Sequence, residues 1–286
     1  MTLEIAIPDS SLEDCSSLRE KTEKIGLLAR AFAIFRVERV IIYKTPAPEG
    51  EFGRDGALLL KLLRFMDTPQ YLRKQTFSHT PILKYAGVLP PLRTRSHPLA
   101  AKTTDLQEGD VRWGIQIRKG LVDLGLDKPI RYDGSMEKHR PMLFRVSSTS
   151  HAINLEVIER EDIEYYFGFE VESIDDINVL LTKYDSFTRI AFSRNGVQFN
   201  KISEDLQSTL SSTGSVLALF GSPKKGVSDI FRDSIDALKS NIDFWVNTIS
   251  NQGTETVRLE EAMFTSFALL NDRFNELYAK PGYYFK

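Results

Sequence analysis

Two short loops near the C-terminus carry residue types that suit a small-ligand site. Residues 219–226 read LFGSPKKG and residues 245–257 read WVNTISNQGTETV, and each loop adjoins an apolar run typical of a buried strand. Ligands of open α/β sheets gather at the carboxyl ends of strands, and glycine lets backbone approach a ligand closely. Gly221, Gly226 and Gly253 occupy such positions. The pattern therefore predicts one ligand site built by both loops.

Familiar nucleotide motifs do not explain these loops. Loop 219–226 lacks the G-x-x-x-x-G-K-[ST] spacing that cradles phosphates in ATPases. No G-x-G-x-x-G follows the first predicted strand, which disfavours a nucleotide-dependent dehydrogenase. His79, His97, His139 and His151 are dispersed and have no cysteine partners, so we expect no metal site.

Both ends of the chain alternate strands with helices, as an α/β sheet requires. Short apolar runs predict strands at residues 3–7, 40–43, 189–192, 216–220 and 242–246, with a turn at 194–196. Apolar residues at helical spacing predict helices at 17–35, 57–65, around 180–181, at 205–210, 230–238 and 256–278. This alternation predicts a mostly parallel sheet covered on both faces.

The middle of the chain has a different pattern. Short alternating runs occur at residues 111–117, 121–124, 142–146 and 153–157, and five glycines punctuate residues 109–134. Short strands at close spacing with glycine turns predict a small β-barrel inserted at residues 92–163. An OB-like barrel has the right size and commonly binds single-stranded nucleic acid. The remaining segments, 1–91 and 164–286, would then form one discontinuous α/β domain.

Charge is unevenly distributed along a chain whose net charge is only -2. Residues 61–102 hold eight lysines and arginines against Asp67 alone, a balance of +7. Residues 151–186 hold ten acidic residues against Arg160 and Lys183, a balance of -8. Each charge taken singly is more often solvated surface, but the asymmetry favours one face that binds phosphate. We therefore expect a nucleic-acid partner.

The composition indicates a globular protein of the cytoplasm. Hydrophobic residues make up 42% and charged residues 27% of the 286 residues, and no run approaches the roughly 18 consecutive apolar residues of a membrane span. The segment MTLEIAIPDSSLEDCSSL lacks the features of a secretory signal. Cys15 is the only cysteine, which excludes an internal disulfide and favours a reducing compartment.

Several motifs in this order resemble the SPOUT (α/β-knot) superfamily. Within it, the chain is similar to the archaeal and eukaryotic RNA methyltransferases that carry a β-barrel insert. The resemblance covers nearly the whole chain, through IPDS at 7–10, KIGLLARA at 24–31, MDTPQYLR at 66–73, GVLPPLR at 87–93, SRNG at 193–196 and NQGTETVR at 251–258. The last motif, followed by Glu260, Glu261 and Ala262, is the most specific. The resemblance implies a trefoil-knotted α/β domain, which the rarity of knots would otherwise argue against.

The resemblance also implies that S-adenosylmethionine is bound by the two loops. Ile249 and Val257 would supply apolar walls. Asn247, Asn251, Gln252 and Thr254 could bond the methyl donor or, equally, stiffen their own loop, since such side chains often bond local backbone. The complete set of expected donor-binding residues is Phe220, Gly221, Ser222, Gly226, Asn247, Thr248, Ile249, Asn251, Gln252, Gly253, Thr254 and Val257.

Residues 26–35 are similar to the first motif of the ribose-methylating SPOUT branch, whose arginine lies at the active site. Arg30 matches that arginine, although an exposed helix charge is the alternative. Arg36 stands where that branch has glycine, and Lys24 where asparagine is common. The expected catalytic residues are Arg30, Arg194, Asn195 and Glu255, with Glu255 or Asn195 as base or orienting group. Glu255 could instead favour the dipole of the following helix.

The expected product follows from the relatives that the motifs resemble. Some are associated with 3-methyluridine in ribosomal RNA, so a uridine base is the leading target. Ribose 2′-O-methylation of transfer or ribosomal RNA and a non-catalytic role in ribosome assembly are the alternatives. The resemblance further implies a homodimer through the knot and last helix, whose apolar residues could otherwise pack within one subunit. RNA contacts are expected from Lys24, Arg64, Arg73, Lys74, Arg93, Arg95, Lys224 and Lys225.

Overall fold

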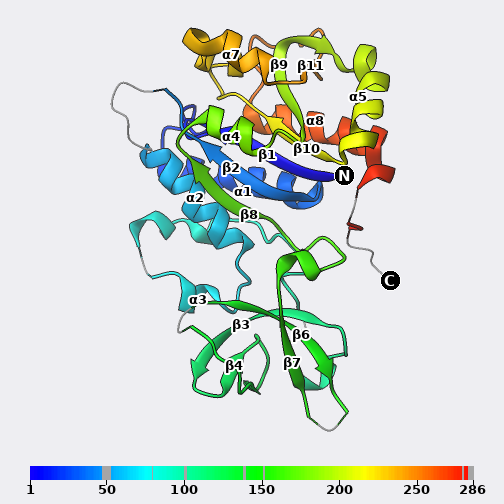
Figure 1. Cartoon of the computed structure of the whole chain (residues 1–286). Helices are drawn as coiled ribbons and strands as arrows, with labels where there is room; N and C mark the ends of the chain where they lie inside the picture. The colour runs from blue at the N-terminus through cyan, green and yellow to red at the C-terminus, as the bar shows by residue number, and fades with distance from the viewer. Residues whose placement is uncertain are drawn as a thin grey trace. The chain divides into compact units, whose positions relative to one another are not determined.

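The computed structural model describes residues 1–46, 53–78, 80–99, 102–137, 140–150, 152–278 and 280–282 (Figure 1). The chain divides into two compact units, which we call unit 1 and unit 2. Unit 1 comprises Met1–Arg64, Ile82–Pro90 and Phe169–Pro281. Unit 2 comprises Phe65–Pro81, Pro91–Gly168 and Gly282–Lys286, so it includes the segment expected as an insert together with flanking residues on both sides.

Unit 1 is built on a parallel sheet of six strands in the order β11-β9-β10-β1-β2-β8. The strands are β1 (Thr2–Pro8), β2 (Val37–Tyr43), β8 (Glu170–Ile174), β9 (Thr188–Gln198), β10 (Ser215–Leu219) and β11 (Phe244–Asn247). The apolar runs of the central strands β1, β2 and β10 are buried on both faces, as is typical of a parallel sheet covered by helices. The predicted parallel α/β sheet is confirmed, and β8 is a strand that the periodicity did not indicate.

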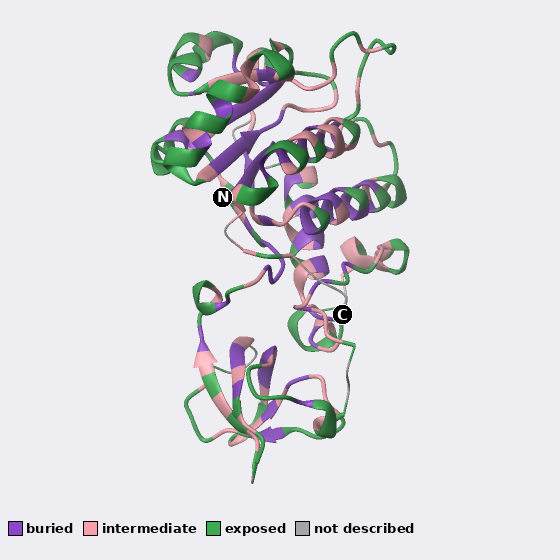
Figure 2. Ribbon diagram, turned by 90° about the vertical axis from the view of Figure 1, so that its right-hand side faces the viewer, coloured by how far each residue is buried: buried purple, intermediate pink, exposed green. Residues whose placement is uncertain are grey.

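Helices cover this sheet (Figure 2). They are α1 (Leu18–Ile34), α2 (Arg54–Asp67), α4 (Ile177–Lys183), α5 (Phe199–Thr213), α6 (Val227–Ile230), α7 (Ile235–Ser240) and α8 (Leu259–Phe274). α1 begins at a capping box, in which Ser17 accepts from the Glu20 amide while the Glu20 carboxylate accepts from the amide of Ser17. α5 ends where Gly214 takes a left-handed conformation.

Two helix predictions need correction. The helix expected at residues 230–238 is broken into α6, a 3-10 turn at Arg232–Ser234 and α7; at this break the Ser234 amide donates to the Phe231 carbonyl three residues back, as in a 3-10 turn. The helix expected at 256–278 is shorter. It begins at Leu259, after the Glu261 side chain caps the Arg258 amide, and gives way to a 3-10 turn at Asn275–Leu277.

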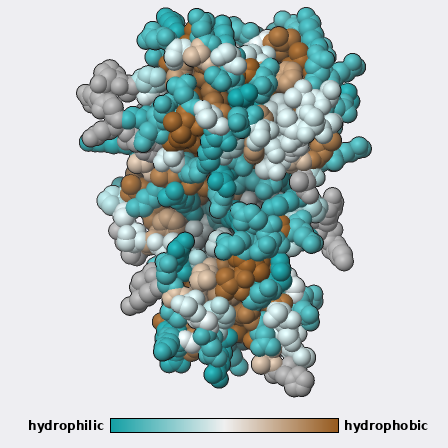
Figure 3. Space-filling view, in the orientation of Figure 1, coloured by the Kyte–Doolittle hydropathy of each residue, from teal (hydrophilic) through white to brown (hydrophobic). Residues whose placement is uncertain are grey.

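Most of the visible surface is hydrophilic, with hydrophobic side chains in separate small groups (Figure 3). Two of the large hydrophobic residues that remain exposed lie on one helix: Leu27 and Ile34 of α1 are each 49% exposed. They are seven residues apart, so they lie two helical turns apart on the same face.

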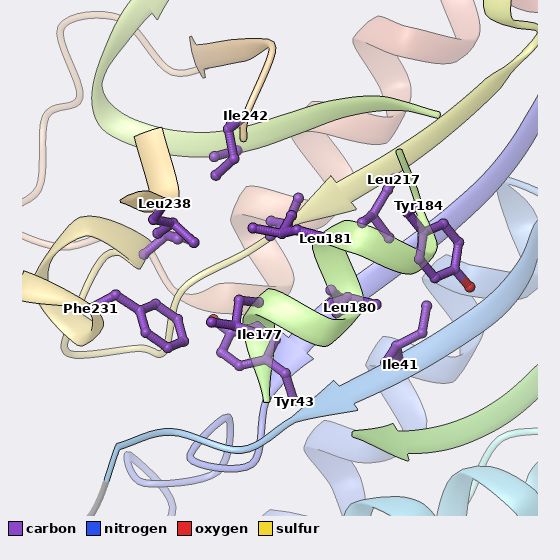
Figure 4. Close-up of a cluster of buried hydrophobic side chains, with 14 residues drawn as sticks. Ile41, Tyr43, Ile177, Leu180, Leu181, Tyr184, Leu217, Phe231, Leu238 and Ile242 are labelled. Carbon is purple, nitrogen blue, oxygen red and sulfur yellow. The ribbon is translucent and has the colours of Figure 1, made fainter. Parts of the chain in front are cut away.

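One face of the sheet is sealed by a continuous hydrophobic cluster (Figure 4). Ile41 and Tyr43 from β2 and Leu217 and Leu219 from β10 pack beneath α4 and the segment from Val227 to Ile242. Elsewhere in unit 1, the Phe32 ring of α1 packs edge to face against the Phe169 ring, with 5.7 Å between the ring centres. The predicted covering of the sheet by helices therefore rests on specific packed side chains.

Unit 2 contains an antiparallel sheet of five strands in the order β5-β4-β3-β6-β7. These are β3 (Val111–Arg118), β4 (Leu121–Asp123), β5 (Ile130–Arg131), β6 (Met142–Ser148) and β7 (Asn154–Ile158). Gly114 is required by packing, since a Cβ there would lie 2.6 Å from Leu124 and 2.9 Å from Phe144. The short strands predicted for this region are confirmed, and they pair antiparallel; among the described residues the ladder runs from β5 to β7 without joining these two edges.

Candidate active site

A cavity lies in unit 1 at the carboxyl ends of β10 and β11 and beside the middle of β9. Both glycine-bearing loops line it, together with residues from β9 and the start of α8. The expected donor-binding residues that line this cavity are Phe220, Gly221, Ser222, Gly226, Asn247, Thr248, Ile249, Gln252 and Val257. Of the expected catalytic residues, Arg194, Asn195 and Glu255 line it. Asn251, Gly253, Thr254 and Arg30 are not among its lining residues.

The middle of β9 bulges at the cavity. Trp245 of β11 pairs with Ala191, but the next residue, Val246, pairs with Val197. One step along β11 thus corresponds to six steps along β9, so residues 192–196 are displaced from the ladder. The turn expected at 194–196 is therefore a bulge inside β9, and it contributes cavity-lining residues from 192 to 195.

Loop 219–226 is held by hydrogen bonds centred on Ser222. The Ser222 hydroxyl donates to the carboxylate of Glu13 and accepts from the backbone amides of Lys224 and Lys225 at 3.3 and 3.0 Å. The Ser222 amide donates to the Lys225 carbonyl at 2.8 Å. A Cβ on Gly221 would lie 2.4 Å from the Lys225 carbonyl oxygen. The hydrogen-bonded conformation of this loop therefore requires glycine at position 221. The Ser222 hydroxyl is occupied by the hydrogen bonds that hold this conformation.

Buried contacts set the position of Phe220, where this loop leaves β10. The Tyr43 hydroxyl donates to the Phe220 carbonyl at 2.7 Å, and the Phe220 amide donates to the Ala6 carbonyl at 3.0 Å. Burial raises the pKa of Tyr43 well above its usual range, so this hydroxyl remains a donor. The Phe220 ring stacks on Phe192 at 4.8 Å and meets Phe267 of α8 edge to face at 5.6 Å. These aromatic rings form an apolar base beside the cavity.

Loop 245–257 is stiffened by its own polar side chains. The Asn247 side-chain amide donates to the Arg194 carbonyl at 2.8 Å, and its oxygen accepts from the Ile249 amide at 2.9 Å. Gln252 donates to the carbonyls of Thr254 and Glu255 at 2.8 and 3.0 Å. Of the two roles weighed for these side chains, loop stiffening is the one for which the structure supplies contacts.

Asn251 and Thr254 also belong to the fold of this loop. Asn251 has a φ of 56°, a left-handed conformation that asparagine tolerates better than most residues. The Thr254 hydroxyl donates to the Thr256 carbonyl at 2.8 Å. A Cβ on Gly253 would meet nothing within 4 Å, so the described chain itself makes no steric demand for glycine there.

Charged groups of both signs line the cavity. Arg194, Lys224 and Lys225 supply positive charge, while Asp229 and Glu255 supply carboxylates. Arg194 donates to the backbone carbonyl of Glu255 at 3.2 Å, which links the β9 bulge to loop 245–257. Such a site can bind a zwitterionic or anionic ligand and still offer a carboxylate for proton transfer.

The expected RNA-contacting residues separate into engaged and exposed groups. Lys24 is buried and forms ion pairs with Asp14 at 2.7 Å and Glu260 at 3.2 Å, so its ammonium group is not presented to a polyanion. Arg64 donates to the Val171 carbonyl at 2.9 Å. Lys74, Lys224 and Lys225 are exposed. The expectation for Lys24 is therefore corrected, because its role in this chain is an internal ion pair.

Arg73 also has an internal role within unit 2. Its guanidinium donates to the carbonyls of Thr68 at 3.0 Å and Met66 at 3.1 Å and lies 4.5 Å from the Phe65 ring centre. Burial lowers the pKa of Arg73 from its usual value. The expectation that Arg73 serves chiefly to contact RNA is thus at odds with its hydrogen bonds, which brace residues 65–73.

Arg93 and Arg95 lie in the following segment of unit 2. Arg93 is exposed and has a φ of 56°, which is unusual for an arginine. Arg95 lies over the Tyr165 ring at 4.3 Å. Both positions remain compatible with an RNA contact, because guanidinium groups can bond phosphate while stacking on an aromatic ring.

Arg30 lies on α1, where it is half-buried. It follows Leu27 by three residues and precedes Ile34 by four, so it shares the helix face that carries these two exposed side chains. Arg30 does not line the cavity described above.

Sequence reasoning missed several residues that build the site. Glu13 and Tyr43 support loop 219–226 from outside it, and Phe192 and Asp229 line the cavity. Phe192 ended a predicted strand, a signal that could have placed it at the site. Glu13 and Tyr43 gave no such signal, because each acts through a contact distant along the chain.

Other chemistries find little support in the described residues. No group of three or more His, Cys, Asp or Glu side chains is placed to hold a metal ion in this part of the chain, and His79, His139 and His151 lie outside it. Burial and the nearby Asp14 carboxylate raise the pKa of the Cys15 thiol to about 11. Each helix within the described ranges is too short or too polar to cross a bilayer.

The chain combines an α/β unit, which has a cavity at the carboxyl ends of strands β10 and β11 of its parallel sheet, with an antiparallel β unit. A family model described as "Putative RNA methyltransferase" matches residues 2–270. The chain therefore belongs to this family and is an RNA methyltransferase.

Relatives extend this similarity over nearly the whole chain. An uncharacterized protein of Haloarcula marismortui is 31% identical, covering 94% of this chain and 99% of the relative. The 28S rRNA (uridine-N(3))-methyltransferase of Mus musculus is 26% identical, covering 98% of this chain and 79% of the relative. The protein of the same name from Homo sapiens is 26% identical, covering 94% and 77%.

Proposed function

We propose that the chain methylates the N3 atom of a uridine in ribosomal RNA, using S-adenosylmethionine as the methyl donor and acting as a homodimer. The observation that carries the proposal is the cavity, which brings together nine of the twelve expected donor-binding residues from two loops separated in sequence. The names of the mouse and human relatives support the choice of uridine N3 and ribosomal RNA.

The cavity suits the chemistry of this donor. Ile249 and Val257 offer apolar surface for the adenine ring, and the loop backbones lie close by. Lys224 or Lys225 would bind the donor's carboxylate, and Asp229 would bind its ribose hydroxyls or ammonium group. When bound, the donor supplies a methyl group on a sulfonium, and transfer then depends mainly on alignment with the nucleophile.

The uridine base must lose its N3 proton as the new carbon–nitrogen bond forms. Glu255 is our candidate base, since the other lining carboxylate, Asp229, already accepts from the Gly226 amide at 3.3 Å. Arg194 would stabilise the developing negative charge on the uracil oxygens, and Asn195 would orient the uracil ring. Arg194 also fixes the backbone at Glu255, so the two groups are held in one arrangement.

We further propose that residues 215–274 form the trefoil knot of a SPOUT domain. β10, loop 219–226, β11, loop 245–257 and α8 follow one another along the chain, and both loops line the same cavity. Unit 2 would be an OB-like RNA-binding module. Its five short antiparallel strands pack around clusters such as Val122, Leu124, Ile130 and Phe144, as a partly open barrel would.

The homodimer would use α1 together with the knot. Leu27 and Ile34 are hydrophobic and half-exposed, and Arg30 lies between them on the same helix. Because Arg30 is outside the cavity of its own chain, we propose that it acts at the partner's site, where it would bind substrate phosphate. α8 contributes less free surface, since Met263, Phe267 and Leu270 are buried within their own subunit.

The test combines donor binding with product analysis. Calorimetry should show one S-adenosylmethionine per chain, and incubation with unmodified ribosomal RNA should yield 3-methyluridine by nucleoside mass spectrometry. Absence of donor binding would leave a non-catalytic role in ribosome assembly. Binding followed by formation of 2′-O-methyluridine would instead reject base methylation.

A further inference from the structure

The turn between β1 and α1 reaches the candidate active site although it is distant from both loops in sequence. Glu13 in this turn is separated from Ser222 by 209 positions, yet its Oε1 atom accepts from the Ser222 hydroxyl. The same oxygen accepts from the Lys224 amide at 3.2 Å. Glu13 is not a cavity-lining residue, so it touches the site only through loop 219–226.

The bond from Ser222 to Glu13 determines how the serine organises its loop. A hydroxyl has one hydrogen to donate and two lone pairs to accept with. Since a carboxylate can only accept, the Ser222 hydrogen points to Glu13. Both lone pairs are then available for the amides of Lys224 and Lys225. One carboxylate thus sets the orientation of three hydrogen bonds in the loop.

The turn that carries Glu13 is itself firmly attached to unit 1. Asp14, the next residue, accepts from the Lys24 ammonium at 2.7 and 2.8 Å. Lys24 is only 5% exposed and also pairs with Glu260 in the first turn of α8, directly after loop 245–257. The turn therefore contacts the loop 219–226 side of the cavity through Glu13 and the beginning of α8 through Asp14 and Lys24.

We propose that Glu13 is a positioning residue for methyl-donor binding, because its carboxylate holds Ser222 and thereby the donor-binding shape of loop 219–226. The inference rests on the proposed function, in which this loop binds S-adenosylmethionine. Losing Glu13 should lower donor affinity, since part of the binding free energy would then be needed to order the loop. RNA contacts made by unit 2 residues such as Lys74 should be unaffected by this change, because Glu13 belongs to unit 1.

The experiment measures binding of S-adenosylhomocysteine to the full chain by calorimetry for three variants. Glu13→Ala removes the acceptor and should raise Kd about tenfold, the effect expected for losing charge-assisted hydrogen bonds. Glu13→Gln keeps an Oε1 acceptor for Ser222 and Lys224, so its Kd should stay within about threefold of the wild-type value. Glu23→Ala is the matched control, because Glu23 is exposed on α1 and pairs only with Arg19 there.

A purely structural role for Glu13 has a different signature. It would lower the melting temperature and the fraction of binding-competent chains, seen as reduced stoichiometry, without changing Kd. That result would overturn the inference, as would equal Kd values for Glu13→Ala and wild type. If the wild-type chain bound no S-adenosylhomocysteine or S-adenosylmethionine, the proposed function would fail first, so the two failures are distinguishable.

Ser222→Ala keeps the test decisive if Glu13→Ala does not fold. This variant removes the same contact from the loop side and should also raise Kd about tenfold. The double variant Glu13→Ala/Ser222→Ala should raise Kd by less than the product of the two single effects, since both single variants remove the Ser222–Glu13 hydrogen bond. If Glu13→Ala is insoluble, an unchanged Kd for Ser222→Ala overturns the inference. If all variants fold, the inference is overturned when the changes in binding free energy of the two single variants add up in the double variant.

Discussion

At the scale of single residues, glycines in the two loops serve different purposes. Gly221 is demanded by its own loop, because a Cβ would lie 2.4 Å from the Lys225 carbonyl oxygen. Gly196, in the β9 bulge, lies so close to β11 that a Cβ would be 2.6 Å from the backbone of Val246. Gly253 faces open space within 4 Å. Close approach to a ligand, the reason expected from sequence, is thus not needed to explain Gly221.

Alanine substitutions should separate these roles. Gly221→Ala should lower the free energy of unfolding by about 1–3 kcal/mol, because the clash is with backbone that cannot rotate away. Donor affinity should fall with it, since the loop must open. Gly253→Ala is the control and should leave both quantities nearly unchanged. Urea unfolding and calorimetry measure the two effects, and equal behaviour of the variants would refute this distinction.

We expect His97 to make the stability of unit 2 depend on pH. Burial lowers the pKa of His97 from its usual value, and its Nε2 bonds the Met66 carbonyl at 2.9 Å. The carbonyl can only accept, so Nε2 carries a hydrogen, and Nδ1 bonds Thr94 at 2.9 Å. The folded chain therefore favours neutral imidazole. Stability is fully present above the unfolded pKa of about 6.5 and declines as pH falls toward the lower folded value.

His97→Gln should remove this dependence, because the glutamine amide can still donate to Met66 without titrating. Between pH 7.5 and 5.5 we expect the wild type to lose about 1 kcal/mol more unfolding free energy than the variant. Both are compared in a Trp245→Phe background, so that Trp113 fluorescence reports on unit 2. Equal losses in the two proteins would exclude His97 as the titrating group.

At the scale of elements, the short helix α3 (Arg73–Thr76) divides a pair of basic neighbours between two roles. Arg73 braces the Met66 and Thr68 carbonyls, whereas Lys74 is exposed. Lys74→Ala should therefore reduce the salt slope of RNA binding by roughly one unit. Arg73→Ala should instead lower unfolding free energy by about 1–3 kcal/mol, because the Thr68 and Met66 carbonyls each lose the hydrogen bond from Arg73. Filter binding across salt concentrations and urea unfolding provide the measurements.

Sequence pattern predicts elements best where burial alone decides their type. β1, β2 and β10 were predictable because short runs of Val, Ile and Leu bounded by turn residues are typical of buried strands. The break between α6 and α7 was not, since apolar periodicity does not distinguish the 3-10 turn at Arg232–Ser234 from a continuous helix. The β9 bulge was expected only as a turn, because register is a property of two strands and periodicity describes one.

The same limit applies to the candidate site. Loops 219–226 and 245–257 were predictable from glycines at strand ends, a local signal. The partners that shape them were not, because Glu13 and Tyr43 act across 209 and 177 positions of sequence. Lys24 was misjudged for the same reason: its charge is visible in the sequence, but Asp14 and Glu260, which neutralise it, are brought together only by folding.

At the scale of the whole molecule, the proposed dimer explains the position of Arg30. Leu27→Glu with Ile34→Glu should give a folded monomer, because two buried charges would be costly at an interface. Methyl transfer should be lost while each chain keeps its own donor cavity. Analytical ultracentrifugation and activity assays test this. A wild-type chain that sediments as a monomer at micromolar concentration would contradict the dimer directly.

Mixed dimers separate the partner role of Arg30 from a role in its own chain. Arg30→Ala and Glu255→Ala should each be nearly inactive alone. In a mixed dimer, one of the two sites would combine the intact Arg30 of one chain with the intact Glu255 of the other, restoring about half of the wild-type activity per mixed dimer. No recovery after verified subunit exchange would place Arg30 outside the partner's site.

The central claim is that the cavity between loops 219–226 and 245–257 binds the methyl donor, and a crystal structure of the chain with S-adenosylhomocysteine tests it most directly. We expect the nucleoside in that cavity, with adenine against Ile249 and Val257 and the sulfur facing the β9 bulge near Arg194. A cavity that stays empty while the nucleoside binds elsewhere on the chain would contradict it.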